Sequence, residues 1–330
     1  MSIEILVCLI VLALAFDFMN GFHDAANSIA TIVSTGAMRP QYAIVWAAFF
    51  NFIAFLFFGL HVAGTVGKGI IDPLIVDHYV VFGALMGATS WNIITWYYGI
   101  PSSSSHALIG GLAGAAVAKG GTGTLVGSGF MKTAAAILIS PALGFLLGAG
   151  LMVLISWLFV RSTPRRVGTL FNSLQFVSAA LYSLGHGSND AQKTMGIIWM
   201  LLIASSTIGP SDDLPFWVIL VCQLAMGLGT LFGGWRIVKT MGMRITKLKP
   251  VSGFAASASG AATLFLATGL GVPVSTTHTI TGAIVGVGAS QKLSAVRWGV
   301  AGNIVWAWIF TIPGSAFIAA VSWWFAQHFF

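Results

Sequence analysis

Charged residues are scarce in this sequence of 330 residues, because they make up only 7% of it. Soluble domains carry roughly 25% charged residues, so this scarcity excludes an ordinary soluble protein. Hydrophobic residues make up 57% of the chain, and 40 of its residues are glycine. Glycine at this level is typical of helices that pack closely within a bilayer. The sequence therefore predicts an all-α polytopic membrane protein that is embedded in the lipid bilayer.

Other signals are missing as well. The net charge of +7 does not indicate a nucleic-acid partner, because no basic stripe with interleaved aromatic residues accompanies it. Cys8 and Cys222 are the two cysteines, and both lie in apolar runs, so a disulfide framework is not expected. No HExxH, CxxC or Walker motif occurs. We therefore expect no metal site, no nucleotide and no other cofactor.

The first apolar run, from Ile3 to Ala15, is similar to the core of a signal peptide. It lacks a basic region before it, carries Glu4, and continues into a polar motif. We therefore expect this segment to be retained.

One pattern of five apolar segments occurs twice. The first copy lies at 3–35, 41–60, 79–98, 103–119 and 133–160. The second copy lies at 169–206, 215–235, 251–270, 275–291 and 296–326. Pairs that recur at an offset of 172 include Asn51/Gln223, Pro101/Pro273, Ser103/Ser275, His106/His278, Gly110/Gly282 and Pro141/Pro313. Pairs that recur at 166 are Gly21/Gly187, Asp24/Asp190 and Ala25/Ala191. We predict an internal duplication, with repeats at 1–160 and 169–330 and a cytoplasmic linker at 161–168.

The orientation of the repeats follows from the number of membrane crossings. If 79–98 and 103–119 form a re-entrant hairpin, each repeat crosses three times and the second repeat is inverted. With both termini extracytoplasmic, 11 basic residues then face the cytoplasm and 3 face outward, with Lys193 set aside. Two full crossings in place of the hairpin would also invert the repeats, whereas a parallel duplication gives at best 9 to 5. The inverted arrangement fits the positive-inside rule better.

Two runs of small hydroxyl residues interrupt the apolar sequence. They read Pro101-Ser-Ser-Ser-Ser-His106 and Pro273-Val-Ser-Thr-Thr-His278. Such runs suit the tip of a helical hairpin, where the first N–H groups of a new helix lack partners and attract anions. Ordinary capping would need a single Ser or Thr. We therefore expect an anion site, with the binding residues Ser103, Ser104, Ser105, Ser275, Thr276 and Thr277.

The residues around these runs are more ambiguous. His106 and His278 stand in the first turn of the new helices, where each either contacts the substrate or bonds a neighbouring carbonyl group. His23, His186 and Asn303 are weaker candidates.

Two polar motifs repeat one spacing, at i, i+3 and i+4 of a helix. Their members are Asp24, Asn27 and Ser28 in the first motif and Asp190, Lys193 and Thr194 in the second. We expect each motif helix to be broken, the first one at Asn20-Gly21. A carboxylate at membrane depth costs several kcal/mol unless it is paired, which favours a functional role over simple helix–helix adhesion.

The two Gly-x-x-Asp-Ala elements and the paired hydroxyl tips together resemble the inorganic phosphate transporter (PiT) family over essentially the whole chain. The family motif is usually written Gly-Ala-Asn-Asp-Val-Ala-Asn-Ala, whereas the first copy here reads Gly21-Phe-His-Asp-Ala-Ala-Asn-Ser28. In the second copy, Lys193 stands where the family often has asparagine. Both departures resemble compact prokaryotic members, and the second argues against a sodium site in that half.

The resemblance implies that phosphate binds between the hairpin tips. It also implies that Asp24, Asn27 and Asp190 bind or relay a coupling cation, H⁺ or Na⁺. A homodimer in the plasma membrane, here the bacterial inner membrane, is a further expectation.

The charges of the motif residues and of phosphate favour co-transport of a cation, independently of the family resemblance. Asp24, Asp190 and Lys193 leave one net negative charge when all are ionised, and phosphate adds one or two more. Moving negative charge inward opposes the membrane potential by about 2.3 kcal/mol per charge per 100 mV. Accumulation therefore requires H⁺, Na⁺ or a divalent metal carried with phosphate, and inverted halves suit alternating access.

Two other functions compete with this interpretation. An intramembrane hydrolase could use Ser105, His106 and Asp24, but adjacent Ser and His side chains point apart on one helical turn. No Gly-x-Ser-x-Gly elbow occurs either, so we expect no enzyme. A transporter or channel for another oxyanion, such as sulfate, remains the alternative.

Overall fold

The computed structural model describes residues 1–329, with the side chain of Lys68 left aside, and the prediction of an all-helical chain is confirmed there. The first half contains α1 (Ile3–Ser34), α2 (Pro40–Phe52), α3 (His61–Gly69), α4 (His78–Tyr98), α5 (Ser104–Gly120) and α6 (Gly127–Leu158). The second half contains α7 (Pro164–Ala204), α8 (Phe216–Phe232), α9 (Trp235–Lys239), α10 (Pro250–Gly269), α11 (Thr276–Gln291) and α12 (Trp298–Phe329). Helices satisfy their own backbone hydrogen bonds, which is what a bilayer demands.

Several helices can cross a membrane by length and composition. Among the described residues these are α1, α6, α10 and α12. The bent pairs α2 with α3 and α8 with α9, kinked by 83° and 62°, bring the number to as many as six. The predicted crossing at 169–206 is the 41-residue helix α7, which carries the second polar motif and is not among the six.

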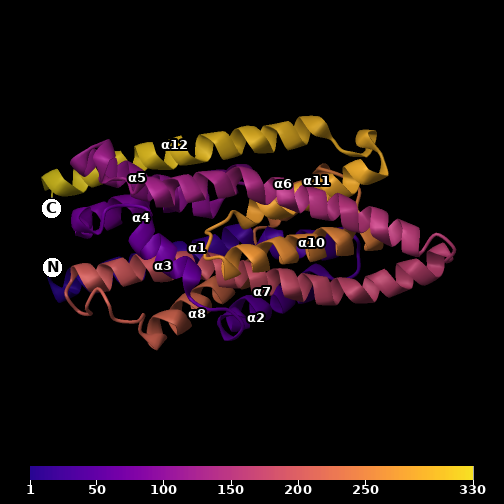
Figure 1. Ribbon diagram of the computed structural model, residues 1–330, viewed down its shortest axis with the longest axis horizontal. Helices are drawn as coiled ribbons and strands as arrows, with labels where there is room; N and C mark the ends of the chain where they lie inside the picture. Colours follow the sequence, from indigo (N-terminus) through magenta and orange to yellow (C-terminus); the bar gives the residue numbers. More distant parts are fainter. Residues whose placement is uncertain (330) are drawn as a thin grey trace.

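The two chain ends lie at the same end of the molecule, and the turn between α6 and α7 lies at the opposite end (Figure 1). The long helices α6, α7 and α12 run along the length of the molecule between these ends. The outer faces of α6 and α12 expose large apolar side chains, including Leu138, Leu146, Trp306, Phe310 and Phe317. Exposed apolar surface on this scale fits contact with lipid.

Two helical hairpins enter the molecule from opposite ends. The hairpin α4–α5 opens toward the end that carries the termini, and α10–α11 opens toward the α6–α7 turn (Figure 1). Their bounds match the predicted arms at 79–98, 103–119, 251–270 and 275–291 to within about two residues. The tips meet in the interior, where the rings of His106 and His278 lie 4.4 Å apart.

Each hairpin packs on the long helix of the other half. Helices α4 and α5 contact α12, while α10 and α11 contact α6. A Cβ added at Gly110 would lie 2.7 Å from the carbonyl oxygen of Ile312, and one added at Gly282 would overlap the carbonyl oxygen of Pro141. Glycine at these related positions lets the backbones approach closely, so the two halves interlock.

The predicted breaks in the motif helices are wrong. Helix α1 runs unbroken through Asn20 and Gly21, and α7 runs unbroken through Gly187. These glycines serve helix contacts instead, because a Cβ at Gly187 would lie 2.5 Å from the carbonyl oxygen of Asn51, and one at Gly21 would overlap that of Met226. The breaks lie in the neighbouring pairs, between α2 and α3 and between α8 and α9.

Candidate functional site

The predicted site residues gather where the two hairpin tips meet the middle of α1 and α7. All of them except Asn303 are at most 3% exposed. One apolar cluster, which includes Leu9, Phe16 and Leu201, lies on one side of this polar group, and another, which includes Ile29 and Ile284, lies on the other side. The polar group is therefore shut off from both ends of the molecule.

The tips begin two helices in the same way. Ser103 Oγ accepts the N–H of His106 at 3.2 Å, and Ser275 Oγ accepts the N–H of His278 at 3.1 Å. Each serine is therefore the N-cap of its helix, α5 or α11. The backbone N–H groups of the next two residues have no carbonyl acceptor within the helix, because the helix does not extend four residues before them, and they point out of the helix end. Such an end, with the positive pole of the helix dipole, suits an anion.

Asn27 and Lys193 make equivalent contacts with the tips. Asn27 Nδ2 donates to Thr277 Oγ1 at 2.9 Å, and Lys193 Nζ donates to Ser105 Oγ. The donors are 166 residues apart and the acceptors are 172 apart, which are the two offsets of the duplication. One contact is thus made twice, and each motif reaches the hairpin of the opposite half.

Asp190 is the most highly connected acid of the group. Lys193 Nζ lies 2.5 Å from Asp190 Oδ1, Thr276 Oγ1 donates to Oδ2 at 3.1 Å, and His186 Nε2 lies 3.3 Å from Oδ2. Lys193 also donates to the carbonyl oxygen of Val274 at 2.8 Å. A single ammonium group therefore links the second motif to both hairpins.

Asp24 has a different partner. His23 Nδ1 lies 2.5 Å from Asp24 Oδ1, and the other ring nitrogen of His23 lies 3.1 Å from Thr95 Oγ1 on α4. In the second half the residue at the position of His23 is Asn189, which donates to Thr268 Oγ1 on α10 at 3.1 Å. In both halves, the residue before the motif aspartate contacts the first helix of the hairpin in its own half, which is α4 or α10.

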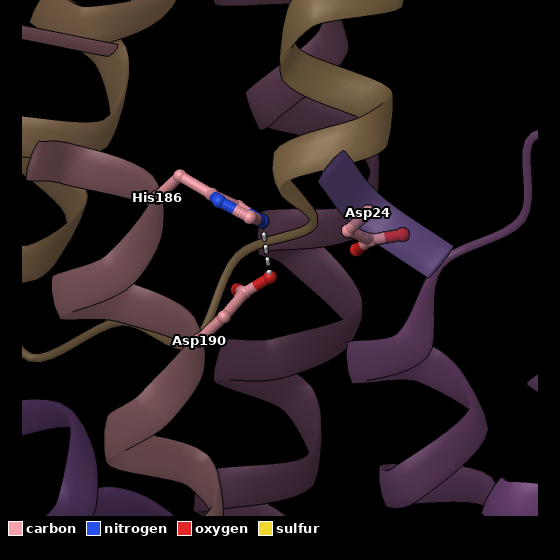
Figure 2. A group of neighbouring side chains, drawn as sticks. All are labelled: Asp24, His186 and Asp190. Atoms are coloured by element: carbon pink, nitrogen blue, oxygen red, sulfur yellow. Dashed lines mark ion pairs between the residues drawn. The ribbon is translucent and has the colours of Figure 1, made fainter. Parts of the chain in front are cut away.

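Three side chains form a candidate cation site. Asp24, His186 and Asp190 offer ligand atoms that all lie within 4.8 Å of one another. Figure 2 shows His186 and Asp190 on one helix and Asp24 across from them. His186 Nδ1 is fixed by Asn51 Oδ1 at 3.2 Å and Ser28 Oγ at 3.3 Å. Two carboxylates and an imidazole suit a divalent ion, and the carboxylates alone could hold Na⁺ or H⁺.

The other predicted residues lie in the buried site, with the exception of Asn303. His278 stacks on Trp308 of α12 with 3.7 Å between ring centroids, and Trp308 Nε1 donates to the carbonyl oxygen of Pro101 at 3.3 Å. The histidine pair therefore lies at the contact between the tips. Thr194 is buried on the motif face of α7. Asn303, in contrast, is exposed on α12 and is not brought into the buried group.

Two buried side chains near the site, Tyr182 and Asp17, are not among the predicted residues. His186 is only a weaker candidate in the sequence, yet it lies beside both motif aspartates. The hydroxyl of Tyr182 donates to the carbonyl oxygen of Thr276 at 2.9 Å and so holds the second tip. Asp17 is fully buried on α1. The signal was present for Asp17, because it stands seven residues before Asp24 and therefore on the same helix face.

Comparison with known proteins gives a consistent result. A sequence model described as the phosphate transporter family matches residues 20–168 and 160–319. A probable low-affinity inorganic phosphate transporter of Rhizobium meliloti is 65% identical over 97% of this chain and 96% of its own length. A protein of the same description from Bacillus subtilis is 46% identical over 98% of both chains. A solved structure described as the sodium-dependent phosphate transporter matches with a TM-score of 0.90 at 27% identity, over 99% of this chain and 100% of that one.

Proposed function

This chain belongs to the phosphate transporter family, and we propose that it carries inorganic phosphate into the cell together with a coupling cation, by alternating access. The family confirms a multi-pass membrane protein that is a transporter and not an enzyme. The observation that carries the proposal is the duplicated contact in which Asn27 and Lys193 join the motif helices to the opposite hairpin tips.

We place phosphate between the first turns of α5 and α11. The free N–H groups at Ser104, Ser105, Thr276 and Thr277 would donate to its oxygens, while Ser103 and Ser275 hold the helix ends in position. Lys193 supports this placement, because its ammonium group already contacts both hairpins and would attract an anion there. Phosphate oxygens would compete with Ser105 Oγ for that ammonium group.

We place the coupling cation at Asp24 and Asp190, with Asn27 and His186 as neighbours. If both acids and Lys193 are ionised, the site carries one net negative charge, and phosphate makes it more negative. A cation offsets this charge and lets the loaded protein reorient against the membrane potential. The similar solved structure is that of a transporter described as sodium-dependent, which supports Na⁺, and the two buried carboxylates suit H⁺ equally well.

We further propose that residues 1–160 and 169–330 are inverted repeats joined by the linker 161–168. The opposite entry of the two hairpins supports this arrangement (Figure 1). Each tip would then gate one side of the membrane in turn. The excess of basic residues on one side favours extracytoplasmic termini, and the location that we propose is the bacterial inner membrane. A homodimer is part of the same proposal.

The test is uptake of radioactive phosphate by the purified protein in liposomes, with H⁺ and Na⁺ gradients imposed separately. We expect accumulation only when a cation gradient is present. Excess sulfate should compete poorly. Equal competition by sulfate would favour the broader oxyanion transporter, and uptake without any cation gradient but with saturation would favour facilitated transport.

A further inference from the structure

Asp17 is a buried carboxyl group that the phosphate and cation sites do not use. It is 0% exposed, and neither of its oxygens has a hydrogen-bond partner among the residues that the structure describes. It lies two helical turns before Asp24 on the same face of α1, or roughly 10 Å along the helix axis. Asn20 lies between them on that face, and its side-chain oxygen also lacks a partner.

The groups that face Asp17 offer it no counter-ion. The hydroxyl of Thr194 on α7 is the neighbouring polar group, and it too lacks a hydrogen-bond partner. The charged side chains that act on Asp17 are Asp190 and Lys193, which lie 2.5 Å apart and neutralise each other. Cys222 on α8 is the remaining titratable neighbour.

The other helices that pack on α1 do not change this balance. Helices α2 and α10 contain no charged residue, and α4 carries one histidine, His78, at its outer end. Helix α1 also contacts α9 and residues 240–244, which carry Arg236, Lys239 and Arg244, but this segment packs on the part of α1 from Phe22 to Ala30, beyond Asp17. The last contacts of α1 are with α5 and α11, whose histidines His106 and His278 lie at the hairpin tips, while Lys119 at the far end of α5 is paired with Asp77. A structural carboxylate in a protein interior is normally hydrogen-bonded, often several times. Within residues 1–329 Asp17 has only the Thr194 hydroxyl beside it and no hydrogen bond of normal geometry. An isolated carboxylate in a medium of low dielectric constant is far more costly than the neutral acid.

We propose that Asp17 is a proton-binding site of the transport cycle and that its proton is a coupling ion. The inference rests on the proposed phosphate transport and names the group that holds the proton. When phosphate draws the Lys193 ammonium group away, Asp190 loses its partner and the surroundings of Asp17 become more negative. Asp17 then binds its proton more tightly. By reciprocity, the proton on Asp17 favours phosphate binding by the same factor.

The position of Asp17 fits this role. Leu9, Ala13 and Phe16 form an apolar seal between Asp17 and the end of the molecule that carries the termini. A proton that enters from that end would therefore reach Asp17 before Asp24. Asp17 has no counterpart in the second repeat, because the residue 166 positions later is Ser183. The hydroxyl of Ser183 donates to the carbonyl oxygen of Ala179 at 2.8 Å. The duplicated motif helix α7 therefore carries no equivalent of Asp17.

The experiment compares the full-length parent with Asp17→Asn in liposomes held at zero membrane potential. A pH gradient of one unit, acid outside, can drive roughly tenfold phosphate accumulation per coupled proton. The parent should show this accumulation, and Asp17→Asn should lose it while phosphate still stabilises the variant against heating. Asp17→Glu should restore accumulation, since it keeps the acid. Asp213→Asn removes an exposed carboxylate and is the matched control.

Infrared difference spectroscopy of the parent against Asp17→Asn at neutral pH gives a second readout that does not depend on transport. It should show the band of a protonated carboxylic acid that the variant lacks. The absence of this band would overturn the proposal, as would pH-driven accumulation by Asp17→Asn that equals the parent. Accumulation by the parent with a Na⁺ gradient alone would also overturn it and leave phosphate transport intact. A parent that transports no phosphate would instead contradict the proposed function.

Discussion

Lys193 and Asp190 lie 2.5 Å apart on successive turns of α7, and neither side chain is more than 2% exposed. A buried ion pair of this kind is costly to break, because the remaining charge has no water to solvate it. The pair also stands between the two hairpin tips, through the contacts of Lys193 with Ser105 and with the carbonyl oxygen of Val274. Any anion that enters there changes the partner of Lys193, and any cation changes the partner of Asp190. Substrate and coupling ion would therefore be linked through one side-chain pair.

Lys193→Asn gives the second motif the residue that the first motif has at Asn27. The variant loses a charge-assisted hydrogen bond to phosphate worth about 1.5–3 kcal/mol, so the KM for phosphate should rise by roughly tenfold to a hundredfold. Initial uptake rates in liposomes measure the change. Lys132→Asn, on the exposed surface of α6, is the matched control. A KM equal to that of the parent would mean that Lys193 serves only to hold the tips together.

Ser103→Ala and Ser104→Ala separate capping from binding at the first tip. Ser103 caps α5, so its loss should lower the free energy of unfolding by about 1 kcal/mol. The Ser104 hydroxyl has no partner within the described part of the protein, so its loss should leave stability unchanged. If Ser104 donates to phosphate, the KM should rise by about fivefold, the equivalent of roughly 1 kcal/mol. Thermal unfolding and uptake kinetics of both variants test this, and the reverse pattern would contradict it.

Structural features that depend on a local sequence pattern or on the internal repeat can be predicted from the sequence. The prediction that the hydroxyl runs form hairpin tips is confirmed, because a Ser or Thr run between apolar arms suits a helix start. Two inverted repeats also predict that the tips face each other, and the 4.4 Å between the rings of His106 and His278 confirms this contact. Both results follow from the duplication, since two related hairpins of opposite direction meet in the middle.

Features that depend on distant partners could not be predicted. The sequence predicts a helix break at Gly21, whereas the packing partner of this glycine, Met226, lies about 200 residues away and no local pattern reveals it. The same holds for the link from Lys193 to Ser105, which joins the two halves. Asn303 is one of the weaker candidates in the sequence, and only the packing of α12 shows that it is exposed.

The contact between the tips can be tested by cross-linking. In a chain with Cys8 and Cys222 replaced by Ala, His106→Cys with His278→Cys should be bridged by a short bis-methanethiosulfonate reagent, because the two histidine rings lie 4.4 Å apart. The cross-link should stop transport, since the tips must separate for either side to open. Activity should return on reduction. His106→Cys with Asn303→Cys is the control pair and should not cross-link. Full uptake by the cross-linked protein would contradict gating by the tips.

Selectivity between phosphate and sulfate should depend on the two motif aspartates. At neutral pH phosphate keeps at least one proton and sulfate keeps none. A buried carboxylate can accept a hydrogen bond from a phosphate P–OH group, whereas it repels sulfate. A site built around a substrate hydroxyl can reject an analogue that lacks it by roughly 10⁴-fold. Asp190 is placed for this role, because Thr276 of the second tip already donates to it at 3.1 Å.

We therefore expect Asp24→Asn to abolish phosphate accumulation, because its charge no longer changes with the cation. Asp190→Asn should do the same and also leave Lys193 without its partner at 2.5 Å. Any phosphate binding that either variant keeps should be competed by sulfate far better than in the parent. Equilibrium binding of labelled phosphate with sulfate as competitor measures the selectivity, and uptake in liposomes measures the accumulation. Asp213→Asn, which changes an exposed acid, should match the parent in both. If Asp24→Asn and Asp190→Asn both concentrate phosphate as well as the parent does, the aspartates are structural, and neither coupling nor selectivity arises from them.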